Sequence, residues 1–293
     1  MTDDRSLIHY LAPDRFVSPV RDEVETFHGT TKLFRATAGA FFRGSLEYML
    51  DERGRVEMTH NRRRYGLAES VRLPDVTPCD ATLDACLASR RSVRTFEDAP
   101  IPLAVLSNIL GAARVRRHLS IGSDSTASVG MRSYPSAGGL FPIETYAALL
   151  NVDGIRPCVA YYDPFAHAIV RVEDLLETRH FNRTLAASDA TAASPPSAPV
   201  VIFACALFER SAVKYMQRGY RFALLEAGMV TYLYSLAAVA NGFGSLHWGG
   251  FFDDEINSCF DLDGLNETIV DCLFVGKPAT GAPTGIGPEQ NGA

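Results

Sequence analysis

The spacing of apolar residues predicts a series of helices and strands from about residue 80 onwards. Apolar side chains recur every three or four positions in residues 80–91 and 103–117, as on one face of an amphipathic helix. A long, almost entirely apolar stretch at 212–240 predicts a helix buried in the fold or in a subunit interface, and a short helix is expected at 254–260. The predicted strands are residues 145–150, 158–162, 168–172, 200–208 and 268–275.

This order of elements indicates an α+β fold. The strands are too few and too scattered for a doubly wound parallel sheet. No GxGxxG or GxxxxGK[ST] motif follows a predicted strand, so neither a dinucleotide-binding βαβ unit nor a P-loop is indicated.

The chain is predicted to have three parts. Residues 1–80 are polar, Arg-rich and weakly periodic, and we expect an amino-terminal extension that packs on the core. Residues 81–277 are the main domain, with a Ser/Gly-rich mobile loop at 118–133 and an exposed Ala/Ser/Pro-rich loop at 186–199. Residues 278–293 are rich in Gly and Pro and are expected to be a disordered tail.

Composition and charge narrow the class of protein. The 293 residues are 47% hydrophobic and 21% charged, which is typical of a globular protein. The net charge of −6 gives no electrostatic reason to expect a nucleic-acid partner. Of the 28 basic residues only Lys32, Lys214 and Lys277 are lysines, which draws attention to each of them.

The cysteines and the apolar segments indicate a cytoplasmic protein. The six cysteines form no CxxC pair and have no His cluster beside them, so we expect buried thiols in a reducing compartment and no metal site. The amino terminus has no apolar run typical of a signal peptide. Residues 222–240 are long enough to span a membrane, but they include Glu226 and stand alone, so a core helix is expected instead.

The first segment with candidate chemistry is RRSVRTF, from Arg90 to Phe96. It places Arg90, Arg91 and Arg94 near the hydroxyl of Ser92. Guanidinium groups bind phosphate in a bidentate manner, so the segment suits a phosphate ligand. The alternative is the solvated end of a helix, where basic residues are common.

The second segment, RSYPSAGGLFP, contains paired glycines. Gly138 and Gly139 follow Pro135, Ser136 and Ala137, and glycines allow the backbone to approach a flat ligand closely. The alternative is a tight turn. No GxSxG motif surrounds Ser136, so an acyl-transfer nucleophile is not indicated.

The third segment begins the long predicted helix with Lys214 and Tyr215. The positive end of a helix would lower the pKa of Lys214, which suits a general base. The alternative is a surface lysine beside a half-buried tyrosine. For Glu226, inside the same apolar helix, a structural hydrogen bond is favoured over catalysis.

The fourth segment, HWGGFF, contains the single tryptophan. Trp248 precedes Gly249 and Gly250, a combination that suits stacking on a planar cofactor. Core packing beside a turn is the alternative.

Together these segments resemble the SagB-type dehydrogenases of the nitroreductase-like flavoprotein superfamily, over about residues 85–276. RRSVRTF, RSYPSAGGLFPIETY, KYMQRGYRFALLEAG and HWGGFFDDEIN match the family's motifs in order, and FHGTTK resembles its amino-terminal region. The resemblance implies a nitroreductase-like fold: a mainly antiparallel central sheet flanked by helices, in a homodimer with two FMN sites at the interface.

The resemblance also implies roles for individual residues. Lys214 and Tyr215 would be the proton-abstracting pair. The residues implied to bind FMN are Arg90, Arg91, Ser92, Arg94, Pro135, Ser136, Ala137, Gly138, Gly139, Trp248, Gly249 and Gly250. The sequence departs from classical nitroreductases in two places: only Lys277 follows the last strand as a phosphate-binding candidate, and Gly139 stands where many of them have an asparagine.

The implied activity is oxidation of a thiazoline or oxazoline ring, peptide-borne or carrier-bound, with hydride transfer to FMN and O2 as the terminal acceptor. The implied partner is a cyclodehydratase or a peptide synthetase. Two alternatives stay open: an NAD(P)H-dependent flavin or nitro reductase, and a non-catalytic scaffold subunit of a heterocyclisation complex.

Overall fold

The computed structural model describes residues 21–36, 38–60, 65–66, 68–120, 128–174, 185 and 197–281. The chain divides into two compact units, residues 1–43 and 44–293. In the described part of the smaller unit, α2 (Arg21–Thr30) ends where the hydroxyl groups of Thr30 and Thr31 donate to the carbonyl of Phe27. The sheet and the candidate site described below belong to the larger unit.

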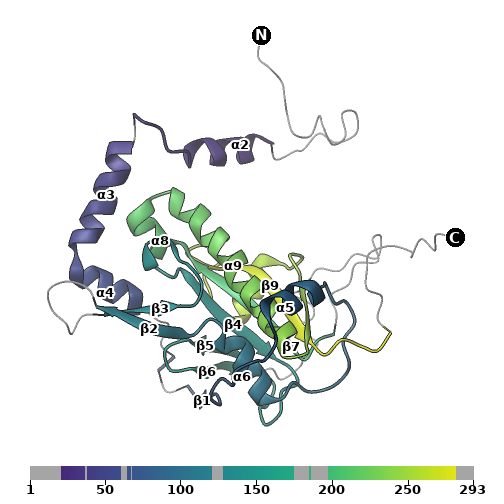
Figure 1. Cartoon of the computed structure of the whole chain (residues 1–293). Coiled ribbons are helices and arrows are strands. Elements are labelled where there is room, and N and C mark those ends of the chain that lie inside the picture. Colours follow the sequence, from purple (N-terminus) through teal and green to yellow (C-terminus); the bar gives the residue numbers. More distant parts are fainter. Residues whose placement is uncertain are drawn as a thin grey trace, which may run out of the picture. The chain divides into compact units, whose positions relative to one another are not determined.

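A seven-stranded sheet forms the centre of the larger unit in its described part (Figure 1). Its strands lie in the order β1-β6-β5-β4-β7-β9-β8, and each neighbouring pair is antiparallel. The sheet consists of β1 (Ser70–Arg72), β4 (Ile143–Leu149), β5 (Cys158–Asp163), β6 (Ala168–Asp174), β7 (Val200–Leu207), β8 (Gly244–His247) and β9 (Glu267–Gly276). β4 and β7 lie in the middle, and almost every residue in them is buried. Burial on both faces explains the continuously apolar sequence of β7, whereas β4 also buries Glu144 and Thr145.

Helices cover both faces of this sheet. On one face, α6 (Leu103–Gly111) and α9 (Arg218–Ala240) share a core with alternate residues of the strands. On the other face, α10 (Asp253–Cys259) packs through Ile256 against a cluster that includes Phe203 and Phe274. The remaining helices of this unit are α4 (Glu52–His60), α5 (Leu83–Ser89) and α8 (Phe208–Tyr215), with the carboxyl-terminal part of α3 (Ala38–Leu50).

The α+β class and the five predicted strands are confirmed, each within a few residues. The helix predicted at 103–117 is too long, because α6 ends at Gly111 and Val115–Ser120 forms β2. The loop predicted at 118–133 is also wrong in its described part, since β2 pairs with β3 (Ser128–Arg132) in a hairpin. The run of Arg and Ser residues in this hairpin hid its strand character, because five of the six β2 residues are exposed.

The long helix predicted at 212–240 is two helices. Met216 has a positive φ of 51°, which ends α8, and α9 begins at Arg218. Gly219 allows the helices to pack this closely, because a Cβ there would lie 2.7 Å from the backbone of Ser211. The residues at the break, Met216 and Gln217, include no glycine or proline, so the sequence carries no local signal that the helix ends there.

The predicted boundary at residue 80 differs from the division between the units. β1 pairs with β6, so residues 70–72 belong to the central sheet, and the units divide between Arg43 and Gly44. Most of the predicted loop at 186–199 and of the predicted tail at 278–293 lies outside the described residues.

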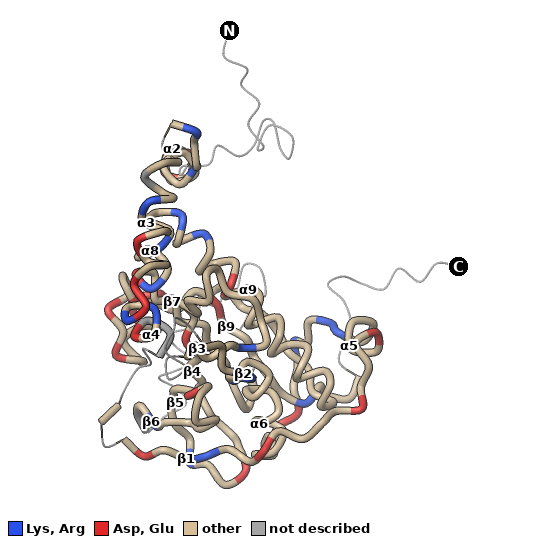
Figure 2. Tube along the Cα trace, turned by 60° about the vertical axis from the view of Figure 1, so that its left-hand side comes forward, with Lys and Arg blue, Asp and Glu red and all other residues tan. Residues whose placement is uncertain are grey.

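By length and composition alone, α9 could cross a membrane. Core helices of globular proteins meet the same criteria, and Ala223, Val230 and Tyr234 bury one side of α9 against the sheet. The outer side is also apolar: residues 227–240 include no Lys, Arg, Asp or Glu (tan in Figure 2).

Candidate active site

The break between α8 and α9 places Lys214 in the last turn of α8. The sequence-based placement at the start of a helix is therefore wrong, and so is the argument from the helix dipole. The negative end of a helix would raise the pKa of a lysine, but the pKa of Lys214 is lowered. Burial lowers the pKa of Lys214, and the positive charge of Arg55 lowers it further.

A tight turn at 136–141 faces Lys214 and Tyr215. Gly138 and Gly139 have φ angles of 65° and 68°, in the region that favours glycine. A Cβ built on Gly138 would lie 2.8 Å from both the amine of Lys214 and the hydroxyl of Tyr215. The turn and the lysine–tyrosine pair, more than 70 residues apart in sequence, therefore meet at one point.

Aromatic rings surround the amine of Lys214. Its Nζ lies 5.2 Å from the ring centroid of Tyr215 and 5.3 Å from that of Tyr48. Tyr215 in turn packs edge-on against Phe222. Burial raises the pKa of Tyr215, so its hydroxyl stays protonated at neutral pH.

Ser136 connects the turn to the interior. Its hydroxyl donates to Oε2 of Glu226 over 2.5 Å, and the amide of Phe141 donates to the Ser136 oxygen over 2.8 Å. Burial raises the pKa of Glu226 to about 7, although this hydrogen bond lowers it. The geometry agrees with the predicted structural hydrogen bond for Glu226.

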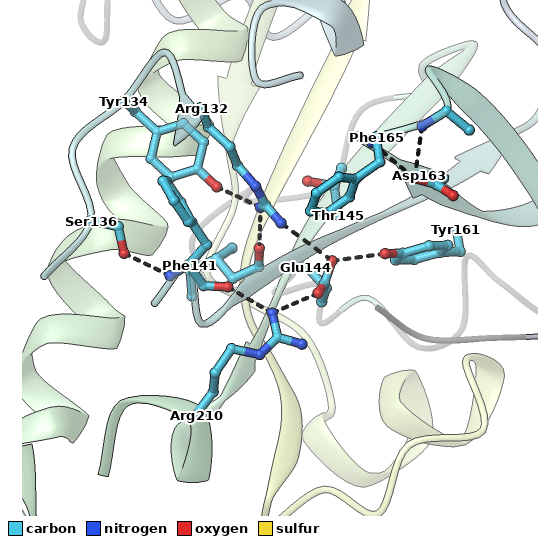
Figure 3. Close-up of polar contacts among 12 residues, drawn as sticks. Arg132, Tyr134, Ser136, Phe141, Glu144, Thr145, Tyr161, Asp163, Phe165 and Arg210 are labelled. Carbon is cyan, nitrogen blue, oxygen red and sulfur yellow. Dashed lines mark hydrogen bonds and ion pairs between the residues drawn. The ribbon is translucent and has the colours of Figure 1, made fainter. Parts of the chain in front are cut away.

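A buried ion cluster lies beneath the turn (Figure 3). Glu144 at the start of β4 accepts from Arg210 over 2.7 Å and from Tyr161 over 2.9 Å, and Arg132 approaches it within 4.0 Å. Arg210 also donates to the carbonyl of Phe141, which has a positive φ of 47°. Glu144 and Arg210 were not among the predicted site residues, although a carboxylate in the largely apolar run IETYAALL signals a buried charge that needs a partner.

The segment from Arg90 to Arg94 lies at the other end of α9. Ser92 pairs with Ser245 in β8, and Arg91 lines a cavity of about 170 Å³ together with Val239 and Gly242. Figure 1 shows α5, which ends just before this segment, and α8 at opposite ends of α9. Glu226 and Val239 are 13 residues apart, so the turn and the arginines are separated by about 20 Å along the helix.

The arginines of this segment suit an anion. Within the described residues, Arg90, Arg91 and Arg94 form no ion pair, and Arg91 and Arg94 are exposed. Lys277 lies near the same segment, but its amine pairs with Glu97 over 3.1 Å. Among the described residues, the guanidinium groups are therefore better suited than Lys277 to a phosphate, and a phosphate contact stays a prediction for all of them.

Trp248 lies in a packed cluster on the α10 face of the sheet. Its ring contacts Phe274 edge-on, and its indole N–H donates to the carbonyl of Gly250 over 2.5 Å. This packing matches the alternative given for the tryptophan, and a role at the flavin for Trp248, Gly249 and Gly250 stays a prediction.

The family model "Nitroreductase family" matches residues 87–277, well over half of the chain. The chain belongs to the nitroreductase family. A relative from Methanocaldococcus jannaschii, MJ1384, named as a nitroreductase, is 33% identical over 66% of this chain and 89% of its own length. The microcin B17-processing protein McbC of Escherichia coli is 32% identical over 45% of this chain, which spans about half (49%) of McbC.

Solved structures of low sequence identity share the fold. A nitroreductase-like protein of Ralstonia eutropha has a TM-score of 0.57 at 24% identity, covering 75% of this chain and 94% of that chain. A chain of the E. coli microcin synthetase McbBCD complex, solved with truncated pro-MccB17 bound, has a TM-score of 0.53 at 21% identity, covering 93% and 98%. An Anabaena variabilis structure has a TM-score of 0.59 at 20% identity, and this chain covers 43% of it.

Family membership confirms the predicted nitroreductase-like fold and its mainly antiparallel sheet. It also identifies the chain as an oxidoreductase of a flavin-dependent family. The similarity to McbC agrees with the resemblance to the SagB-type dehydrogenases.

The first prediction compares the two glycines of the turn. Gly138→Ala would place its Cβ against Lys214 and Tyr215, whereas Gly139→Ala would meet no atom within 4 Å. Both carry the strain of a positive φ, on the order of 1–2 kcal/mol. We expect similar losses of stability in urea unfolding, but a much larger loss of turnover in Gly138→Ala. Equal turnover in the two variants would contradict the assigned contact.

The second prediction concerns Glu226. Because its pKa in the folded protein is about 7 against 4.5 in the unfolded chain, the folded state holds the proton more tightly. The free energy of unfolding should therefore fall as pH rises between these values, by on the order of 3 kcal/mol at most. Glu226→Gln should remove this fall in urea unfolding at about pH 5 and pH 8.

The control is Glu255→Gln, the same change at an exposed residue of α10. It should leave the pH dependence of the wild type in place. A Glu226→Gln protein with that same pH dependence would show that Glu226 titrates normally.

Proposed function

We propose that the protein is an FMN-dependent dehydrogenase that oxidises a thiazoline or oxazoline ring to the corresponding azole. The convergence of the Lys214 amine and the Tyr215 hydroxyl on the Gly138 turn is the observation that carries this proposal. A base beside a flavin suits a substrate that loses a proton as well as a hydride. The similarity to the microcin B17-processing protein McbC supports the substrate class.

The chain has features that suit FMN. The guanidinium groups of Arg90, Arg91 and Arg94, which form no ion pair with any described residue, suit its phosphate. The exposed backbone at Gly138 and the open space at Gly139 suit a flat ring. When bound, FMN would supply the hydride acceptor and pass the electrons on to O2.

Conversion of an azoline to an azole removes two hydrogens, one as a proton and one as a hydride. Lys214 suits the proton because its lowered pKa leaves more neutral amine at physiological pH. Tyr215 is the poorer base, because its raised pKa disfavours the phenolate. Its hydroxyl instead orients the substrate by donating a hydrogen bond, and Gly138 leaves room for both groups.

A homodimer fits the positions of the two segments. The turn and the arginines are separated by about 20 Å along α9, and this separation favours a flavin that is held between two chains. A second copy that packs on the apolar outer side of α9 would bring its own arginines to the turn. Leu224, Leu225, Met229 and Tyr232 are the exposed apolar residues on that side.

The proposed substrate is a heterocycle carried by a peptide or by a carrier protein, and the proposed partner is the cyclodehydratase or peptide synthetase that forms it. The structural similarity to a chain of the McbBCD complex, solved with truncated pro-MccB17, supports a peptide substrate. Cytoplasmic localisation, with the cysteines reduced, is part of the same proposal.

An NAD(P)H-dependent reductase is the second candidate, favoured by the 33% identity to MJ1384. Anaerobic addition of NADPH distinguishes the two candidates. A dehydrogenase should keep its oxidised flavin spectrum with NADPH and lose it with an azoline peptide; rapid bleaching by NADPH would favour the reductase. A colourless protein that takes up no FMN but binds a cyclodehydratase would favour the scaffold.

The third prediction tests the base. Lys214→Ala should keep the bound flavin and lose about 10²- to 10⁴-fold in azoline turnover, the usual contribution of a general base. Tyr215→Phe should lose less, because it retains the ring that packs beside Lys214. Lys32→Ala, an exposed lysine of the smaller unit, serves as the control. Near-normal turnover of Lys214→Ala would overturn the assignment.

The fourth prediction tests the phosphate contact. Arg94→Ala should lower the flavin content of the purified protein and weaken the binding of added FMN, because a bidentate contact is lost. Arg117→Ala removes the same charge from exposed strand β2 and should leave FMN binding unchanged. Full flavin occupancy in Arg94→Ala would rule out this role.

A further inference from the structure

Residues that precede the family match reach the amine of Lys214. The match begins at residue 87, whereas Tyr48 and Met49 of α3 both contact this amine. Ser45, one turn earlier, donates from its hydroxyl to the Lys214 carbonyl over 3.2 Å. This hydrogen bond fixes α3 to the last turn of α8, where carbonyl groups lack partners within the helix.

These contacts leave the amine poorly solvated. Lys214 is 9% exposed and Tyr48 is 8% exposed. Within the described residues, the only hydrogen-bond acceptor of the Lys214 amine is the Met49 sulfur at 3.6 Å, and the amine has no carboxylate partner. A thioether is a weak acceptor, and the faces of the Tyr48 and Tyr215 rings replace only part of the water that an ammonium group loses, so burial lowers the pKa of Lys214.

Arg55 of α4 adds a repulsive charge. Its guanidinium donates to the Met49 carbonyl over 3.3 Å, which ties α4 to the end of α3. In the part of the chain that the structure describes, the titratable groups that face the Lys214 amine are thus Tyr48, Arg55 and Tyr215, and Asp51 faces Tyr48. Among the described residues, Arg55 is the one charged group that acts on the pKa of Lys214, and its charge disfavours a second cation.

We propose that Tyr48, Met49 and Arg55 are positioning residues of the active site, which enclose the Lys214 amine and keep it neutral for use as a base. This inference rests on the proposed function for the role of the base, but the enclosure itself is independent of any substrate. It gives the segment from Ser45 to Arg55 a part in the chemistry of the family domain. The lowered pKa of Lys214 is the property through which these residues act.

Because the chain has few lysines, the pKa of the Lys214 amine can be measured without a substrate. The chain has only Lys32, Lys214 and Lys277, so competitive acetylation with a trace of acetic anhydride, read by mass spectrometry, reports each amine separately. Only a neutral amine reacts, so the pH midpoint of labelling reports its pKa. In the wild type, Lys214 should be labelled with a lower midpoint than the exposed Lys32 and Lys277.

The deciding variant is Arg55→Gln. Removal of the charge should move the Lys214 midpoint upward and lower its labelling at neutral pH relative to Lys277. Arg53→Gln is the matched control, because Arg53 lies on the same helix but is exposed and paired with Glu57. It should leave the midpoint of Lys214 unchanged.

A second pair of variants tests the enclosure. Tyr48→Ala should admit water and move the Lys214 midpoint upward, whereas Tyr48→Phe keeps the ring and should restore the wild-type value. Circular dichroism verifies that each variant folds. If Tyr48→Ala does not fold, the labelling midpoint of Lys214 in Arg55→Gln alone tests the proposal. An unchanged Lys214 midpoint in Arg55→Gln, or a wild-type midpoint equal to that of Lys277, would overturn the proposal.

Activity then separates this inference from the proposed function. If the protein oxidises an azoline, the acidic limb of its kcat/KM profile should move to higher pH in Arg55→Gln, together with the labelling midpoint. A labelling shift in a protein that oxidises no azoline would refute the proposed function and leave the enclosure of Lys214 established. If the protein oxidises an azoline but Arg55→Gln does not shift the labelling midpoint of Lys214, the enclosure is refuted and the proposed function stands.

Discussion

The ionised carboxylate of Glu144 is costly to bury, and the way in which it is paired shapes the active site. Arg210 from α8 neutralises it and at the same time holds the Phe141 carbonyl, so one guanidinium joins the central strand β4, helix α8 and the turn at 136–141. Loss of one partner of such a buried pair typically costs about 3–5 kcal/mol. The turn and the helix that carries Lys214 are thus positioned by the same charge.

The sequence predicted the parts of the fold whose signal is local. β7 is apolar throughout because both of its faces are covered, and α9 was recognisable by its length and composition. The break at Met216 was not predictable in the same way. The break depends on the close packing of α8 on α9 at Gly219. The positive φ of Met216 cannot be read from a pattern of hydrophobic and polar residues, because methionine rarely adopts this conformation.

In the candidate site, too, the local motifs were predictable from the sequence and the tertiary contacts were not. Motifs identified Lys214, Tyr215 and the glycine turn, but nothing in the spacing of residues 138 and 214 shows that they touch. Tyr48 and Arg55 were missed because they lie in a polar stretch with weak periodicity, far from any motif. Such residues are found only when the fold brings them to a group whose chemistry they alter.

The apolar outer side of α9 has a thermodynamic consequence. Leu225 is 60% exposed, and Leu224, Met229 and Tyr232 are each more than 40% exposed, on a helix in which the nearby Glu226 is buried. A surface of this kind links folding to self-association, since whatever covers it stabilises only the folded chain. For the proposed homodimer, stability then becomes a property of protein concentration: dilution alone lowers the melting temperature by mass action, with no change in the chain itself.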